Sequence, residues 1–175
     1  MIPPTLRRIF TTRTLLLLFI LIGSLVVYTY SVFYPKTIQA PQSVYTTIKG
    51  NKIELEKMRG NPVIVTFWAS DCASCIKEMP HLIKLYNEFH NEGLKIIAIA
   101  MYYDVPNHVV EIAKAKQLPY PIVLDLKAEH AKAFGQVELI PATFLISPKG
   151  KIIMKKIGLF DTTMMKQKIE KILQG

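Results

Sequence analysis

Two cysteines, Cys72 and Cys75, are the only cysteines in this chain of 175 residues. An apolar run at 62–67 leads into them, and apolar residues at spacings of three and four follow them. This order predicts a strand, a tight connection and a helix whose first turn holds both cysteines. Two thiols placed in this way lie on one face of the helix, close enough to close a small disulfide ring.

The two positions predict different roles for the two sulfurs. Cys72 lies where the free backbone N–H groups and the dipole of a helix start favour a thiolate. Cys75 lies one turn deeper, and we expect it to be the more buried of the two. An exposed thiolate beside a shielded partner suits reversible dithiol–disulfide exchange, so we predict Cys72 as the attacking nucleophile and Cys75 as the resolving thiol.

Three other interpretations of the cysteine pair are weaker. A zinc site needs about four ligands, and beyond the pair the sequence offers only 4 scattered histidines. A purely structural disulfide at this spacing would constrain the unfolded chain little. Two inert core thiols are the third alternative. We therefore expect redox chemistry carried by the cysteine pair itself, with no metal and no other cofactor.

Several motifs resemble the thioredoxin superfamily and, within it, the membrane-anchored TlpA/ResA-like thiol–disulfide oxidoreductases of bacteria. The resemblance covers about residues 43–174 and rests on Phe67-Trp68-Ala69, on the Cys72-x-x-Cys75 pair with Glu78 and Pro80 after it, and on Ile140-Pro141-Ala142-Thr143-Phe144. It implies an α/β, thioredoxin-like fold. The central mixed sheet is flanked by helices and carries an N-terminal β-hairpin and a helix–strand insertion.

The resemblance also implies roles for single residues. It implies a cis-proline at Pro141 that packs against the cysteines, and an acid–base role for Glu78. It assigns Trp68, Ile140 and Pro141 to client binding, with the Ile140-Pro141 segment pairing with an extended client backbone.

Two positions depart from the family pattern. Many relatives carry an uncharged residue just before the first cysteine, where this chain has Asp71. A carboxylate there opposes formation of the Cys72 thiolate. Thioredoxin itself has a buried Asp on the preceding strand, where this chain has Thr66. That leaves Glu78 as the acid–base candidate.

The resemblance implies an enzyme that reduces client disulfides, with apocytochrome c cysteines as candidate clients, and that is itself reduced by a transmembrane electron donor. An oxidase of the same fold would run the same steps in reverse, and Ala73-Ser74 between the cysteines does not fix the direction. A Sco-like copper-handling module is a further alternative, although its cysteines have three residues between them and these have two. A peroxiredoxin-like peroxidase is disfavoured, because Ala69 stands where that family has Thr.

The N-terminal region predicts a membrane anchor. Residues 14–34 carry no charge, and as a helix they would span about 31 Å, enough for a hydrocarbon core. Three arginines precede the stretch and Lys36 follows it closely. The positive-inside rule then predicts a cytoplasmic segment 1–13 and a periplasmic or other extracytoplasmic domain, at a bacterial inner membrane. A signal peptide cleaved after Ala40 is disfavoured, because Pro41 would impede the peptidase.

After the anchor we expect a linker, 35–42, and a thioredoxin-like domain, 43–175. From residue 35 onward the chain has 19 Lys and Arg against 13 Asp and Glu, a net charge of +6. This charge favours weak attraction to an anionic bilayer, whereas no aromatic-and-basic stripe supports nucleic-acid binding. The patterns predict a hairpin within 45–55, four buried strands at 63–67, 94–101, 122–124 and 143–147, and an edge strand at 151–157. Helices are expected after Cys72, Val105, Lys127 and Asp161.

Overall fold

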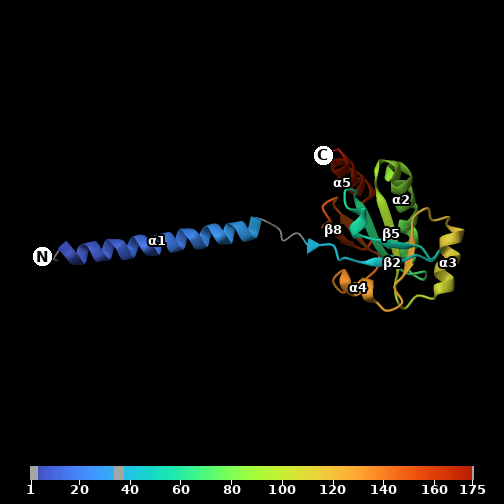
Figure 1. Ribbon diagram of the computed structural model, residues 1–175, viewed down its shortest axis with the longest axis horizontal. Helices are drawn as coiled ribbons and strands as arrows, with labels where there is room; N and C mark the ends of the chain where they lie inside the picture. The colour runs from blue at the N-terminus through green and yellow to red at the C-terminus, as the bar shows by residue number, and fades with distance from the viewer. Residues whose placement is uncertain (1–3, 34–37, 175) are drawn as a thin grey trace. The chain divides into compact units, whose positions relative to one another are not determined.

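The computed structural model describes residues 4–33 and 38–174. The chain divides into two units, residues 1–36 and 37–175. The first contains one helix, α1 (Pro4–Phe33), so residues 14–33 of the predicted anchor are helical (Figure 1). Residues 34–37 lie outside the described residues. Within the described part of the chain, no helix has the length and apolarity needed to cross a membrane. The predicted transmembrane span is therefore not confirmed.

The second unit is built on a six-stranded mixed sheet with the order β1-β8-β7-β4-β5-β6. Its centre is β4 (Val63–Trp68), which pairs in parallel with β5 (Lys95–Ala100) and antiparallel with β7 (Ala142–Ile146). Further out, β6 (Ile122–Leu124) runs parallel to β5, and β8 (Lys151–Ile157) runs antiparallel to β7. The predicted thioredoxin-like arrangement is thereby confirmed.

The edge of the sheet differs from the prediction. Strand β1 (Ile38–Gln39) pairs antiparallel with β8, so β8 is not the edge strand that its alternating pattern indicated. The sheet also takes in two residues that the sequence assigned to the linker 35–42. A strand of two residues is too short to show any alternation, which is why the pattern missed it.

Strand β4 separates two apolar layers, because successive side chains of a strand point to opposite faces. Ile64 and Trp68 pack in one cluster, and Val65 and Phe67 pack in the other. All residues of β4 are buried. Cover on both faces explains why its sequence is apolar at every position except Thr66.

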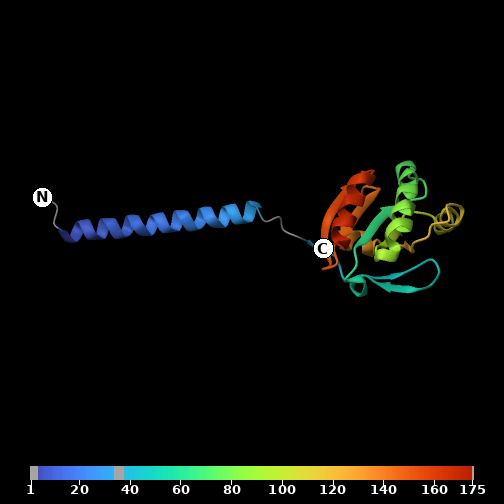
Figure 2. The same ribbon diagram turned by 90° about the horizontal axis from the view of Figure 1, so that it is seen from above.

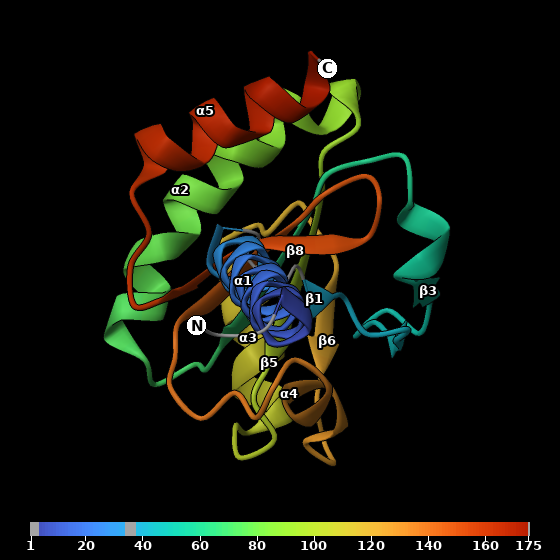
Figure 3. The same ribbon diagram turned by 90° about the vertical axis from the view of Figure 1, so that its left-hand side faces the viewer.

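The helices distribute over these two layers. Helices α2 (Ala73–Phe89), α3 (Pro106–Ala115) and α5 (Thr162–Leu173) contribute to the cluster that contains Trp68. Figure 3 shows α2 and α5 side by side, and a Lys166–Glu88 ion pair joins them. On the opposite face lies the short α4 (Glu129–Ala133), with Ala131 in the second cluster. Helix α2 continues through Pro80.

The predicted hairpin is present as β2 (Val44–Thr46) and β3 (Lys52–Glu54), which form a separate two-stranded sheet (Figure 2). The backbone N–H of Ile48 donates to the carbonyl of Ile122 at 2.9 Å and joins the hairpin to the main sheet. Two short 3₁₀ helices, Glu56–Met58 and His90–Glu92, complete the described elements.

Candidate active site

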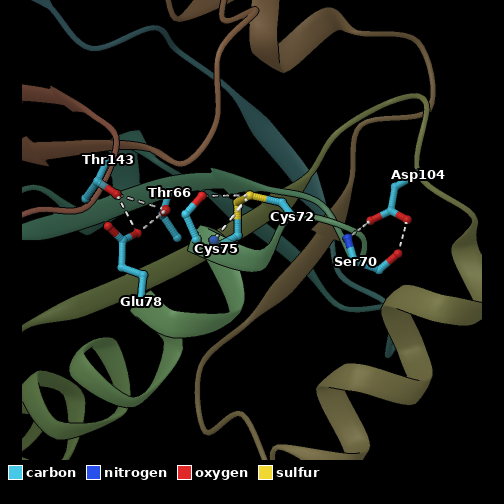
Figure 4. The surroundings of a disulfide bond; sticks show 8 residues. Thr66, Ser70, Cys72, Cys75, Glu78, Asp104 and Thr143 are labelled. Atoms are coloured by element: carbon cyan, nitrogen blue, oxygen red, sulfur yellow. Dashed lines mark hydrogen bonds between the residues drawn. A yellow bond between two sulfur atoms is a disulfide. The ribbon is translucent and has the colours of Figure 1, made fainter.

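A disulfide joins Cys72 and Cys75 at the start of α2, with the two Cα atoms 5.2 Å apart (Figure 4). Cys72 is the N-cap residue, and its Sγ accepts a hydrogen bond from the backbone N–H of Cys75 at 3.2 Å. Cys75 is 2 % exposed, whereas Cys72 is half-buried. The two cysteine residues thus differ in exposure in the sense that their positions on the helix predicted.

Glu78 lies one turn further along α2 and is also 2 % exposed. Its Oε2 accepts hydrogen bonds from the hydroxyls of Thr143 at 3.1 Å and Thr66 at 3.5 Å (Figure 4). Its Oε1 accepts from the backbone N–H of Phe160 at 3.3 Å. Burial raises the pKa of Glu78, and these three donors offset part of that rise.

The two threonines that hold Glu78 face each other across the sheet. Thr66 on β4 and Thr143 on β7 are register partners, and their hydroxyl oxygens are 3.0 Å apart. The resemblance placed a buried Asp of thioredoxin at the position of Thr66. In this chain the carboxylate of Glu78 on α2 lies at the position of that Asp, where it accepts a hydrogen bond from the Thr66 hydroxyl.

The Ile140–Pro141 peptide bond is cis, as the resemblance implied. Pro141 is buried and Ile140 is half-buried. Ile140 and Cys72 both pack against the apolar cluster that contains Cys75. Trp68, the third residue assigned to client binding, is 2 % exposed. Its side chain is therefore part of the core.

The sequence analysis missed an acid that holds the loop before the cysteines. The Asp104 carboxylate accepts a hydrogen bond from the backbone N–H of Ser70 at 2.6 Å and another from its hydroxyl at 2.5 Å (Figure 4). The order of the strands could have indicated this contact. Asp104 follows β5, which runs parallel to β4, and the carboxyl ends of parallel strands meet at one edge of a sheet.

A second residue that the sequence analysis did not select is Tyr120, which precedes β6. It is 4 % exposed and lines a small internal cavity together with Trp68, Cys75 and Glu78. No local pattern connects Tyr120 with α2, because the two meet only through the packing of the sheet.

Within the described part of the chain, no three His, Cys, Asp or Glu side chains lie close enough together to hold a metal ion. Among the described residues, the Sco-like alternative would therefore have only the cysteine pair itself as metal ligands.

Residues 37–155 match the sequence profile of the AhpC/TSA family. The chain belongs to this family of the thioredoxin superfamily. It is 34% identical over 135 residues to the thiol-disulfide oxidoreductase ResA of Bacillus thuringiensis subsp. konkukian (strain 97-27), covering 77% of this chain and 76% of that protein. It is 30% identical over 136 residues to ResA of Bacillus subtilis (strain 168), covering 78% and 75%.

Solved structures agree with this membership. StoA from Bacillus subtilis has a TM-score of 0.62 and 32% identity, over 73% of this chain and 97% of that one. The thioredoxin domain of a thiol-disulfide oxidoreductase from Bacteroides vulgatus has a TM-score of 0.67 and 26% identity, over 77% and 98%. This AhpC/TSA-family chain is thus a thiol–disulfide oxidoreductase of the thioredoxin-like type, as its cysteine pair predicted.

Proposed function

We propose that this chain is a membrane-tethered, extracytoplasmic enzyme that reduces client disulfides through Cys72 and Cys75. The observation that carries the proposal is the unequal exposure of the two cysteine residues at the start of α2, half-buried for Cys72 and 2 % exposed for Cys75. An accessible sulfur at a helix N-terminus attacks well, and a shielded neighbour completes the exchange. The similarity to proteins named thiol-disulfide oxidoreductase ResA supports the same chemistry.

The reaction runs in two displacements. The Cys72 thiolate attacks one sulfur of the client disulfide, forming a mixed disulfide while the other client sulfur leaves as a thiolate and takes up a proton. Cys75 then loses its proton and attacks the Sγ of Cys72, and the second client sulfur leaves in the same way. The client gains two electrons and two protons, and the enzyme dithiol becomes the Cys72–Cys75 disulfide.

Glu78 is placed to exchange the proton that Cys75 loses and regains. It is buried on the same helix, three positions after Cys75, and lines the same cavity. Because burial raises the pKa of Glu78, its carboxyl group takes up a proton at a higher pH than an exposed glutamate does.

The client is bound at the edge of the sheet where β4 ends and β7 begins. The register pairs Phe67 with Ala142, so the Ile140-Pro141 segment lies at the same edge as the cysteines and is available to an extended client backbone. Three large side chains in the loops at this edge are 50% to 65% exposed: Tyr102, Tyr103 and Leu139. Such a surface suits apolar client segments, and apocytochrome c cysteines are the clients to test first.

Replacing Cys72 tests the proposed chemistry. We expect Cys72→Ser in the full chain to abolish the reduction of insulin disulfides by dithiothreitol, because no attacking sulfur remains at the surface. Circular dichroism of the variant against reduced wild type controls for folding. Full activity in a folded Cys72→Ser chain would remove the assignment.

The direction of electron flow is tested by the reduction potential of the Cys72–Cys75 disulfide, equilibrated with glutathione. A potential well below the poise of the compartment is expected for a reductant that a transmembrane donor recharges. A potential well above that poise would instead make the enzyme an oxidase.

The tether is supported by the sequence of 14–34, which carries no charge, and by the arginines before it. We expect the full chain to remain with the membrane pellet after an alkaline carbonate wash. A variant that lacks residues 1–36 is expected in the supernatant. Impermeant thiol reagents should label the reduced domain in intact cells, and recovery of the full chain in the soluble fraction would contradict the tether.

A further inference from the structure

A groove of about 590 Å³ lies between the tip of the β2–β3 hairpin and the C-terminal half of α3, and neither cysteine lines it. Figure 2 shows the tip of the hairpin beside α3. The groove is completed by residues 117–122, which lead from α3 into β6. Pockets that bind small molecules typically have about 300–1,000 Å³, so this groove has the size of a ligand site.

The apolar part of the groove is made of small and flat side chains. Val110 and Ala113 line it from one face of α3, because residues three positions apart lie on the same side of a helix. Three consecutive rings line it from the segment that follows α3: Pro119, Tyr120 and Pro121. Rigid rings of this kind pack well against a flat apolar ligand such as an aromatic ring.

The charged groups at the groove are all positive. Lys49 at the hairpin tip and Lys114 on α3 line it from two different elements. Neither lysine forms an ion pair with a residue that the structure describes. Among the described residues that line the groove, none is an aspartate or a glutamate. Two unpaired ammonium groups without an acid between them favour an anionic ligand, and a carboxylate accepts charge-assisted hydrogen bonds from both.

Gln117 has a backbone conformation that does not suit its side chain. The N–H groups of Gln117 and Leu118 donate to the carbonyls of Lys114 and Ala113, which ends α3 in a motif that usually has glycine at the position of Gln117. Its φ of 50° is in the left-handed region, where a Cβ is unfavourable. Strained positions of this kind cluster at ligand sites. The Gln117 side chain lines the groove, and its amide group donates hydrogen bonds to carboxylates.

We propose that this groove binds a small aromatic carboxylate. The ring of the ligand packs against Pro119 and Pro121 and the apolar face of α3. Its carboxylate accepts hydrogen bonds from the ammonium groups of Lys49 and Lys114 and from the amide of Gln117.

The groove is separate from the surface at which the client is bound, yet it is connected to the active site through shared residues. Leu118 and Tyr120 line the groove and also line the internal cavity beside Cys75. A ligand in the groove therefore contacts two side chains that enclose the buried cysteine.

The first experiment compares a charged and a neutral ligand of the same shape. Naphthalene-2-carboxylate and naphthalene-2-carboxamide are titrated by calorimetry into the full chain in neutral detergent micelles, with empty micelles as the blank. We expect saturable one-to-one binding of the carboxylate, and binding of the amide that is at least about tenfold weaker because the charge-assisted hydrogen bonds are lost. Equal affinities, or no saturable binding of the carboxylate, would overturn the proposal.

The second experiment removes the charges one at a time. We expect Lys49→Gln and Lys114→Gln each to weaken binding of naphthalene-2-carboxylate about threefold, the usual size of an exposed ion pair. The matched control is Lys116→Gln, because Lys116 is an exposed lysine at the C-cap of α3 that does not line the groove. Its affinity should match wild type. An equal loss in all three variants would show only general attraction by a basic surface and would overturn the site.

Gln117→Gly separates binding from folding. Glycine adopts the left-handed conformation more easily, so we expect a higher midpoint of urea denaturation than in wild type. Binding of naphthalene-2-carboxylate should nevertheless weaken about threefold, because one hydrogen bond to the ligand is lost. An unchanged affinity in the stabilised variant would contradict the role of Gln117 in the site.

The position of the ligand is measured by the backbone amide chemical shifts of the full chain. The largest changes on adding naphthalene-2-carboxylate are expected at the hairpin tip, 47–51, and at 113–122. Changes concentrated at 139–141 would place the ligand at the client surface and overturn the proposal. None of these measurements requires disulfide exchange, so their outcome is independent of the proposed function.

Discussion

Two carboxylates in this domain are equally buried, and they are held by different kinds of donor. Glu78 and Asp125 are each 2 % exposed. Asp125 accepts hydrogen bonds from the backbone N–H groups of His130 at 3.0 Å and Ala131 at 2.8 Å, both in α4. Glu78 accepts from one backbone N–H and two threonine hydroxyls, and it lines a cavity with Cys75.

The kind of donor separates a structural acid from a reactive one. A backbone N–H only donates, so Asp125 must remain an acceptor to hold the start of α4. A threonine hydroxyl donates or accepts, so Thr66 and Thr143 remain paired with Glu78 whether or not it carries a proton. Burial alone does not identify a proton-exchanging acid; the proposed role of Glu78 is supported by its reversible partners and by the cavity that it lines with Cys75.

The largest expected effect is on stability, at Asp125. We expect Asp125→Ala to lower the free energy of unfolding by about 3 kcal/mol, because two N–H groups lose their acceptor at about 1–3 kcal/mol each. Urea denaturation measures this loss. The folded fraction should reduce insulin disulfides at the wild-type rate. A slow but fully stable variant would reverse the roles of the two acids.

The next effect is on rate, at Glu78. We expect Glu78→Gln to slow insulin reduction about a hundredfold, the usual size of a lost general acid–base contribution. Its free energy of unfolding near neutral pH should change by less than about 1 kcal/mol, since the amide donates to a threonine hydroxyl that turns round. Asp125→Asn is the matched control, and an equal loss of rate in both variants would remove the distinction.

A pH titration sharpens the same contrast. The pKa of Glu78 is raised in the folded state above its ordinary value of 4.5, so the folded chain binds this proton more tightly than the unfolded chain. The stability that this proton contributes is present below pH 4.5 and is lost as the pH rises through the folded pKa. The stability of oxidised Glu78→Gln relative to wild type should therefore increase with pH. A difference that stays constant in urea denaturations across that range would contradict the raised pKa.

The smallest effect is expected where Asp104 holds Ser70. The Asp104 carboxylate accepts one hydrogen bond from the backbone N–H of Ser70 and one from its hydroxyl. Ser70→Ala removes only the hydroxyl, so we expect a loss of about 1 kcal/mol in stability. The rate of insulin reduction should change less than about threefold, because only part of the free energy of one hydrogen bond would affect the reaction. A fall as large as that of Glu78→Gln would place Asp104 in the proton exchange.

Much of the fold was predictable because its elements have strong local patterns. The almost continuous apolar run of β4 and the three-and-four spacing of α2 predicted a buried strand followed by a helix. The last helix was correctly predicted to follow Asp161, whose carboxylate caps α5 by accepting from the N–H of Met164 at 2.8 Å. The two-residue β1 was missed, since pairing with β8 and not its own pattern makes it a strand.

The site was predictable only in part, for a similar reason. The unequal exposure of Cys72 and Cys75 follows from helix geometry alone. The partners of Glu78 do not, because Thr143 and Phe160 are 65 and 82 positions away in the sequence. Trp68, which the resemblance assigned to client binding, lies on β4 and packs in the same layer as Ile64.

The assignment of Cys72 as the attacking sulfur is tested most directly by trapping the mixed disulfide with insulin. We expect Cys75→Ser to accumulate an adduct on Cys72, identified by mass spectrometry after proteolysis, because the resolving thiol is missing. Cys72→Ser should form no adduct under the same conditions. An adduct on Cys75 of the Cys72→Ser chain, formed as fast as that on Cys72, would contradict the assignment.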